Sequence, residues 1–339
     1  MAEQHTNSWQ WVASDGYEIP PTPTILALQR WWRSISAQWE SDQEDGSAEL
    51  GQVANSQPLQ VDGADGIAAL DQYLAEWLSN ENDGGSLRWI ISPPYSHVKP
   101  IAQDWLTANG FEELKIPNRD KLALNQLEGD ISITGNGPWF VPELGHAFLR
   151  QSKGLRWVRL FFAKALSGEL GKGVVICDSW AWQFLQQLWP VSGQQTLTLQ
   201  AFDSERLRQL GLDRDEHQLK HLAALSRGNL GVACAYSNSS YHKRVGDQQS
   251  PFELPTMPVE TTDYTAFILH ALLLHCGLTQ HQLQNVLPIV PPTHLDIELH
   301  QLRQCGLIEL LKSNWQVTAR GYPVVRQALV SRGLLADAF

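Results

Sequence analysis

The stretch that decides the fold is LRWIISPPYSHVKP, residues Leu87–Pro100, which continues directly into IAQDWLTANGF, residues 101–111. Its first part is a short apolar run typical of a buried strand, and two prolines then begin a tight loop. From residue 101 onward, apolar side chains recur at helical spacing until Asn109–Gly110 ends the pattern. The stretch therefore predicts a strand, a loop and a helix in direct succession.

Strands and helices continue to alternate around this stretch. Strands are predicted for FEELKIP at 111–117, WFV at 139–141, Val174–Cys177 and TLTLQAF at 196–202. Helices are predicted for Gly66–Leu78, for 101–109, for a segment behind Asn118 as N-cap, for Leu144–Leu166 and for the residues up to Trp189. This alternation favours a mainly parallel, doubly wound α/β sheet over residues 61–202.

Past residue 203 the strand pattern stops. Three short helices are predicted within 203–245, and a proline-containing linker follows at 246–262. Residues 263–339 predict three helices, a hairpin turning at Lys312–Asn314 and a closing helix, with Thr279 and Thr293 as N-caps of the second and third helices. Three helices, a two-stranded wing and a closing helix are the elements of a winged helix-turn-helix domain.

Residues 1–60 differ from the rest of the chain and predict an N-terminal arm with one helix, at 22–40. The arm carries eight acids against two bases, and it holds five of the fourteen tryptophans. These aromatic side chains either close the core or dock a partner protein; they are Trp9, Trp11, Trp31, Trp32 and Trp39.

The composition is that of a globular protein, and a cytoplasmic one is expected. The chain has 339 residues, of which 43% are hydrophobic and 18% charged. It has neither an apolar run of ~20 residues, as a membrane span needs, nor a signal-peptide pattern. The four cysteines are far apart without CxxC spacing, which predicts buried thiols and no zinc site. The net charge of −11 disfavours a broad nucleic-acid surface.

The loop after the first strand has the position of a phosphate-binding loop but not its residues. Such a loop needs GxxxxGK[ST], because glycines let backbone N–H groups cradle the phosphates and the Ser/Thr holds magnesium. A register that begins at Ser92 puts His97 on the second glycine and Val98 on the lysine. If Lys99 is the lysine, Val98 replaces the glycine and Pro100 the hydroxyl residue. Magnesium-dependent hydrolysis is therefore not expected, and an ordinary βα turn is the alternative interpretation.

The segment GVVICDSW is the second candidate for site chemistry. Four apolar residues followed by Asp178 have the shape of a Walker B strand, whose acid positions magnesium. The residue after it, where many ATPases have a catalytic acid, is Ser179. The alternative interpretation is that Asp178 simply caps the following helix.

The order of these features resembles AAA+/STAND-like P-loop ATPases with a C-terminal winged helix, across roughly residues 65–339. The resemblance implies an α/β fold with a mainly parallel P-loop-type sheet, a helical lid at 203–245 and a winged-helix domain at 263–339. In LAALSRGNLGVA, residues 222–233, the helix break matches the lid, and the resemblance implies that Arg227 senses the γ-phosphate. The alternative is a plain helix end with Gly228 as its C′ residue.

A vestigial nucleotide cleft between the domains follows from this resemblance. The chain departs from the P-loop ATPase pattern at the positions that hold phosphate and activate water. We therefore expect no cofactor and no metal; the alternative is that ATP and magnesium bind. The cleft residues are Ser92, Ser96, His97, Lys99, Asp178 and Arg227.

The expected function is that of a degenerate ATPase, a pseudo-ATPase that acts as a regulatory or scaffold subunit through protein contacts and has no catalytic residues. The first alternative is an atypical ATP-binding switch with weak ATPase activity, using Lys99 and Asp178. The second is a DNA-binding winged-helix regulator. The helix at 293–305 disfavours it, because Asp296 and Glu298 outweigh Arg303, and phosphate contacts supply most affinity for DNA. A protein partner is expected, and DNA is not.

Overall fold

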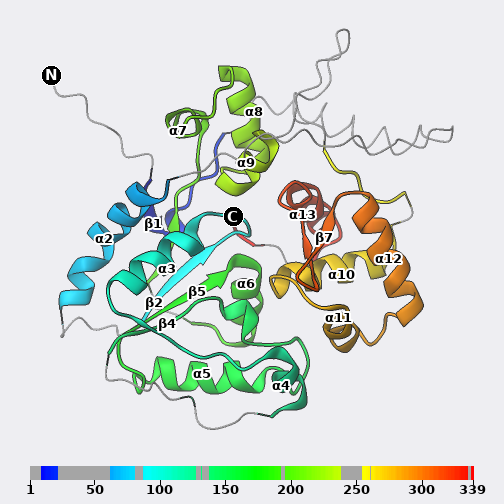
Figure 1. Cartoon of the computed structure of the whole chain (residues 1–339), viewed down its shortest axis with the longest axis horizontal. Helices are drawn as coiled ribbons and strands as arrows, with labels where there is room; N and C mark the ends of the chain where they lie inside the picture. The colour runs from blue at the N-terminus through cyan, green and yellow to red at the C-terminus, as the bar shows by residue number, and fades with distance from the viewer. Residues whose placement is uncertain are drawn as a thin grey trace.

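The computed structural model describes residues 9–21, 62–80, 87–126, 131, 137–191, 195–237, 254–259, 261–334 and 337–339. It is an α/β protein with a six-stranded sheet of order β1-β6-β2-β5-β4-β3 (Figure 1). The strands are β1 (Trp11–Ala13), β2 (Leu87–Ser92), β3 (Glu112–Glu113), β4 (Trp139–Val141), β5 (Gly173–Asp178) and β6 (Thr196–Leu199). Neighbouring strands pair in parallel, except β1, which is antiparallel to β6. The prediction of a mainly parallel α/β sheet is confirmed.

Strands β2 and β5 form the centre of the sheet, and every residue of both strands is buried. Their side chains alternate between two apolar clusters, with Ile90 and Ile176 in one and Trp89 in the other. The register of the pair places Ser92 beside Asp178. Since parallel strands end at the same edge of a sheet, both polar residues lie at that edge, where open α/β sheets bind their ligands.

Helices pack against both faces of this sheet. Helices α2 (Ala64–Ser79) and α3 (Val98–Ala108) pack against each other and contribute to the same apolar cluster as Ile90. Helix α5 (Arg156–Leu166) lies on the opposite face, and α6 (Ser179–Leu188) follows β5 directly. Helix α4 (Arg119–Leu124) begins as predicted, because the Asn118 side chain accepts a bond from the Asp120 N–H.

The long helix predicted over Leu144–Leu166 is wrong in its first half. A short 3₁₀ helix, η2, covers Leu144–His146, and α5 begins only at Arg156. Between them the chain doubles back, since the Leu149 N–H donates to the Gly154 oxygen at 3.3 Å. A side chain at 154 would lie 2.6 Å from the Leu149 oxygen, so only glycine fits this tight turn.

Three short helices follow the sheet and form what we call the three-helix unit: α7 (Ser204–Gln209), α8 (Glu216–Ser226) and α9 (Leu230–Ser237). Asp203 and Asp215 cap the first two helices through their side chains. Helix α8 ends at Arg227 and Gly228, both with positive φ, which confirms the predicted helix break.

Residues 263–331 form a second unit, here called the hairpin unit. Its elements are α10 (Asp263–Leu274), α11 (Gln280–Val286), α12 (Pro292–Gln304), β7 (Ile308–Leu311), β8 (Asn314–Val317) and α13 (Tyr322–Ser331). Thr279 caps α11 as predicted, with a complete capping box. The predicted cap at Thr293 is wrong, because Pro292 begins the helix, where its fixed φ is already helical. Lys312 and Ser313 have positive φ, as a two-residue hairpin turn requires.

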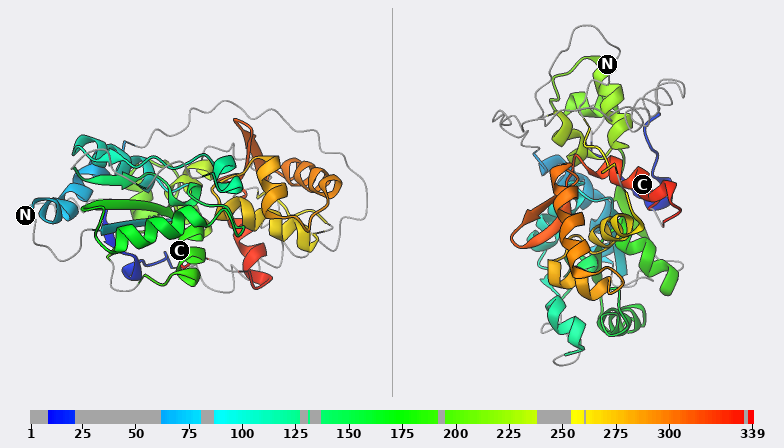
Figure 2. Two further views of the ribbon diagram at one scale, coloured as in Figure 1. Left: turned by 90° about the horizontal axis from the view of Figure 1, so that it is seen from below. Right: turned by 90° about the vertical axis from the view of Figure 1, so that its right-hand side faces the viewer.

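The three-helix unit and the hairpin unit contact the loop that follows β2, at the carboxyl ends of the central strands (Figures 1 and 2). Helix α10 packs against α6. The Arg119 guanidinium on α4 donates to the main-chain oxygens of His275 and Gly277, in the turn between α10 and α11. The Tyr236 hydroxyl on α9 donates to the Arg320 oxygen at 2.5 Å and so joins the two units.

Two of the arm tryptophans take part in the core. Trp9 and Trp11 are 2% and 6% exposed, and the Trp11 indole donates to the Gly66 oxygen at 3.1 Å. Of the two roles considered for these residues, core packing is the one observed. The other arm tryptophans, the predicted helix at 22–40 and most of the predicted linker at 246–262 lie outside the described residues. Within the described chain, no helix combines the length and apolarity that crossing a membrane would take.

Candidate functional site

The loop between β2 and α3, residues 93–97, lies at the carboxyl edge of the sheet. It is a tight turn in which the Ser96 N–H donates to the Pro93 oxygen at 3.3 Å and Tyr95 has a φ of 66°. His97 occupies the N-cap position of α3 without making a capping bond. Burial lowers the pKa of His97, so its imidazole is neutral at pH 7. Ser92 is buried at the end of β2, next to Asp178.

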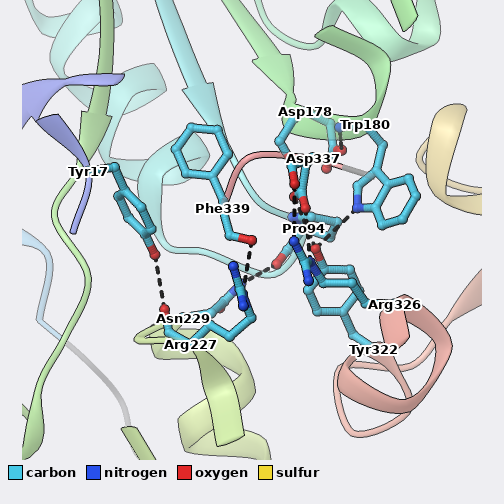
Figure 3. Close-up of polar contacts among 11 residues, drawn as sticks. Tyr17, Pro94, Asp178, Trp180, Arg227, Asn229, Tyr322, Arg326, Asp337 and Phe339 are labelled. Atoms are coloured by element: carbon cyan, nitrogen blue, oxygen red, sulfur yellow. Dashed lines mark hydrogen bonds and ion pairs between the residues drawn. The ribbon is translucent and has the colours of Figure 1, made fainter. Parts of the chain in front are cut away.

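Residues of the three-helix unit and of the hairpin unit both contact this loop. The Asn229 side-chain amide donates to the Pro94 oxygen at 2.6 Å (Figure 3). Helix α9 approaches so closely that a Cβ at Gly231 would lie 1.8 Å from the Tyr95 oxygen. The Tyr95 hydroxyl donates to the main-chain oxygen of Val317 on β8. The loop therefore presents carbonyl oxygens to its neighbours, whereas a phosphate cradle presents N–H groups.

Lys99 on α3 is paired with a carboxylate that the sequence analysis did not single out. Its Nζ lies 3.7 Å from Oε2 of Glu143, which follows β4. The other oxygen, Oε1, accepts from the N–H groups of Gly145 at 2.9 Å and Asp178 at 3.1 Å. An apolar strand followed by Pro142 and Glu143 was the sequence signal for this acid, the same kind of signal that drew attention to Asp178.

Asp178 caps helix α6. Its Oδ1 accepts from the Trp180 N–H at 2.9 Å, which is the alternative role considered for it above. The side chain is buried, and burial first, then the nearby Glu143 carboxylate, raise the pKa of Asp178 well above its ordinary value. Lys99 opposes this rise. Asp178, Glu143 and Lys99 thus converge at the edge of the sheet from β5, β4 and α3.

Arg227 is directed toward a different group. It ends α8, and its Nε donates to the main-chain oxygen of Phe339 at 3.0 Å (Figure 3). The Tyr17 hydroxyl donates to the Arg227 oxygen at 3.1 Å, and the Tyr17 and Phe339 rings lie 4.8 Å apart, edge to face. Burial and the neighbouring Arg326 lower the pKa of Arg227. The partner of the Arg227 side chain is therefore the main chain of Phe339.

Asp337 forms the centre of a second polar cluster, which sequence reasoning missed. Its Oδ2 accepts from the Ser179 hydroxyl at 2.5 Å and the Tyr322 hydroxyl at 3.2 Å, and its Oδ1 accepts from Arg326 Nε at 3.0 Å. The Trp180 indole N–H donates to the hydroxyl oxygen of Tyr322 at 3.1 Å. An acid close to several aromatic residues carries no motif, so the sequence offered no signal for it.

The cysteines next to this region are not activated nucleophiles. Burial first, and Glu143 second, raise the pKa of Cys177 and Cys276 well above the ordinary thiol value. Both thiols are therefore protonated at pH 7. In the part of the chain that the structure describes, no group of three or more His, Cys, Asp or Glu side chains is placed to hold a metal ion.

A cavity of about 590 Å³ lies away from this edge, between β1, α2 and α7. Its lining mixes aromatic, amide and charged side chains, from Trp9 and Trp11 to Asp203 and Arg206. None of the site residues predicted from the sequence lines it.

The fold and this edge define an α/β protein whose central parallel strands end beside buried polar side chains. No protein-family model matches the chain, and no curated protein matches it. Among solved structures, the chain is similar to a Walker-type ATPase of Pyrococcus abyssi, with 14% sequence identity and a TM-score of 0.36. That likeness covers 83% of this chain and 99% of the archaeal chain.

Proposed function

We propose that the chain is a degenerate P-loop-type ATPase, a pseudo-ATPase that acts as a regulatory or scaffold subunit through protein contacts. In this proposal the three-helix unit is the lid and the hairpin unit is a winged helix. The observation that carries the proposal is the packing of the loop at 93–97 against both units. Asn229 holds the Pro94 oxygen, and Gly231 lies against the Tyr95 oxygen.

The chemistry of the loop supports the loss of phosphate binding. A cradle needs successive backbone N–H groups and glycines that let phosphate approach. Pro93 and Pro94 have no N–H groups, and the Ser96 N–H is already bonded within the turn. Tyr95 places a side chain where a cradle has open space.

The charged groups near the loop support the loss of hydrolysis. Asp178 is engaged as a helix cap, and its raised pKa favours the neutral acid, which binds magnesium poorly. Lys99 is paired with Glu143 and not free to hold a phosphate. Arg227 is bonded to Phe339. Three of the groups that the resemblance assigned to a nucleotide, Lys99, Asp178 and Arg227, thus have partners within the chain.

The surface of the hairpin unit supports a protein partner over DNA. Helix α12 exposes Asp296 and Ile297, the latter at 54%, and the wing exposes Leu310 and Leu311 at 45% and 49%. Exposed aliphatic side chains on a helix and wing fit a protein surface. A helix that contacts DNA needs basic side chains for the phosphates, and α12 has one, Arg303.

An atypical ATP-binding switch is the second candidate, because Lys99, Glu143 and Asp178 converge at the edge of the sheet and the Lys99 side chain is 37% exposed. Titration calorimetry with ATP and magnesium decides between the two. We expect no heat of binding up to ~1 mM ATP for the wild type. Micromolar binding that disappears in Lys99→Ala, and persists in the surface variant Lys220→Ala, would establish the switch instead.

The scaffold role has its own test. Ile297→Asp and Leu311→Asp would place charges on the exposed aliphatic surface of the hairpin unit without entering the core. We expect the set of proteins that co-purify from the native host to shrink for these variants relative to the wild type, while Asp213→Ala leaves it unchanged. An identical set for all of them would argue against a role for this surface. DNA retention that falls as salt rises would support the winged-helix regulator.

A further inference from the structure

The strongest unassigned feature of the molecule is the set of donors around the Asp337 carboxylate. Three side chains from two distant parts of the chain converge on it: Ser179 at the start of α6, and Tyr322 and Arg326 on α13. The Arg326 Nη2 also donates to the Asp337 main-chain oxygen at 3.0 Å. Figure 3 shows Tyr322 and Arg326 beside the Asp337 carboxylate.

All of these donors are withdrawn from solvent. Ser179 and Tyr322 are 2% and 4% exposed, and the side chains of Arg326 and Asp337 are 13% and 1% exposed. A buried guanidinium with two hydroxyls is the donor set that binds an oxyanion, since charge-assisted bonds are strong where water is excluded. The arrangement is more than a surface ion pair, because each oxygen of the carboxylate has a defined donor.

A second guanidinium, that of Arg227, lies near the cluster. Burial first, and the neighbouring Arg326 second, lower the pKa of Arg227, and Asp337 opposes that effect. Asp178 and Tyr17 are the other titratable groups near the cluster. Burial raises the pKa of both side chains, which favours their neutral forms. Removing the Asp337 carboxylate would leave the largely buried Arg326 guanidinium and two hydroxyl groups around a vacant oxyanion position.

We propose that Ser179, Tyr322 and Arg326 form an oxyanion-binding site, and that the Asp337 carboxylate is its internal ligand. A small free carboxylate or phosphate is the external ligand that the same donors bind when the Asp337 side chain is removed or withdrawn. The inference is independent of the proposed function, because it holds whether or not the chain binds a nucleotide.

This internal ligand joins three parts of the molecule. Asp337 connects α6 on the sheet to α13 of the hairpin unit, and two residues later Phe339 accepts from Arg227 of the three-helix unit. Segment 337–339 therefore acts as a strap across the edge where Asp178 ends β5. Binding of an external oxyanion in place of Asp337 would release this strap.

Chemical rescue tests the proposal. Asp337→Ala removes the carboxylate and leaves space and unpaired donors, a change that is strongly destabilising for a buried ion pair. We expect its Tm to fall, and then to rise saturably by about 2 °C or more when formate, acetate or inorganic phosphate is added, relative to sodium chloride of equal ionic strength. The wild type and the exposed-surface control Asp213→Ala should show no such rise.

Two further variants define the site. Asp337→Asn fills the position with an uncharged amide of the same shape, so we expect lower stability and no rescue. The double variant Asp337→Ala with Arg326→Gln lacks the cation, and we expect rescue to disappear. Rescue by phosphate at lower concentration than by formate would show that the site admits a tetrahedral oxyanion; the reverse order restricts it to carboxylates.

Several outcomes would overturn the proposal. Absence of any saturable rise for Asp337→Ala would do so, as would an equal rise in the double variant or in the wild type. If Asp337→Ala is unfolded without added anion, the same titration becomes a refolding titration. Formate-dependent recovery of the folded state, followed by circular dichroism, is then the expected result, and failure to recover it rejects the site.

Discussion

The Tyr95 hydroxyl donates to the main-chain oxygen of Val317, so the loop after the central strand β2 is bonded directly to the hairpin strand β8. The two residues are 222 positions apart in the sequence. The Tyr95 ring also lies 5.8 Å from the Tyr322 ring, edge to face. One side chain of the loop thereby contacts two elements of the hairpin unit, β8 and α13.

Replacing Tyr95 by phenylalanine tests this link. The ring contact with Tyr322 is kept, and only the hydroxyl that reaches Val317 is lost. We expect the free energy of unfolding to fall by about 1 kcal/mol, the usual net value of one such hydrogen bond. Urea unfolding measures the change, and Tyr73→Phe, at a side chain that is 43% exposed, is the matched control. Equal stability of both variants would mean that the Val317 bond contributes nothing.

Gly231 is expected to be intolerant of any side chain. Alanine at this position of α9 would normally favour the helix, yet its Cβ would lie 1.8 Å from the Tyr95 oxygen. We expect Gly231→Ala to destabilise the fold by about 3 kcal/mol, as overpacking does, or to separate α9 from the loop. Thermal unfolding and amide hydrogen exchange of residues 95–97 report the two effects. Gly137→Ala, which has open space around it, should be close to neutral.

Much of the fold could be predicted from local sequence signals. The apolar runs of β2 and β5, the Asn118 and Thr279 caps and the break at Gly228 depend on neighbouring residues only. The failed cap at Thr293 has a local cause, because Pro292 begins the helix instead, whereas the failed helix over Leu144–Leu166 has a tertiary cause. The turn around Gly154 depends on a close backbone contact with Leu149, which helical periodicity does not register.

The candidate site was less predictable, because its contacts join distant segments. Lys99 and Asp178 were found from their places beside apolar strands. Their partner Glu143 was missed, although its sequence signal resembled that of Asp178. The Ser179–Asp337 bond spans 158 positions, and a single sequence carries no indication of such a pair.

The raised pKa of Asp178 predicts a pH dependence of stability. A carboxyl group whose pKa is higher in the folded state binds its proton more tightly there, so stability declines as pH rises above the unfolded value of about 4. Asparagine still caps α6 but has no charge to bury. We expect Asp178→Asn to gain stability relative to the wild type as the pH rises above about 4. Denaturant unfolding at several pH values measures it.

Asp203→Asn is the matched control for that series, because Asp203 also caps a helix but at a less buried position. Its stability difference from the wild type should change little over the same pH range. If the stability difference between Asp178→Asn and the wild type also did not change with pH, this would contradict the assignment of a buried, preferentially neutral carboxyl group at the end of β5.

The buried His275 side chain predicts a pH dependence of stability opposite to that of Asp178. It is fully buried beside Phe148, and burial first, then Arg119, lower its pKa well below the ordinary value of 6.5. The unfolded chain therefore binds a proton that the folded chain excludes, so stability is lost as pH falls below about 6.5. We expect His275→Gln to be less stable than the wild type at pH 7 but to lose less on acidification. His300→Gln, at an exposed position of α12, should parallel the wild type at every pH. If stability depended on pH in the same way for His275→Gln and the wild type, another group would be responsible for the loss of stability in acid.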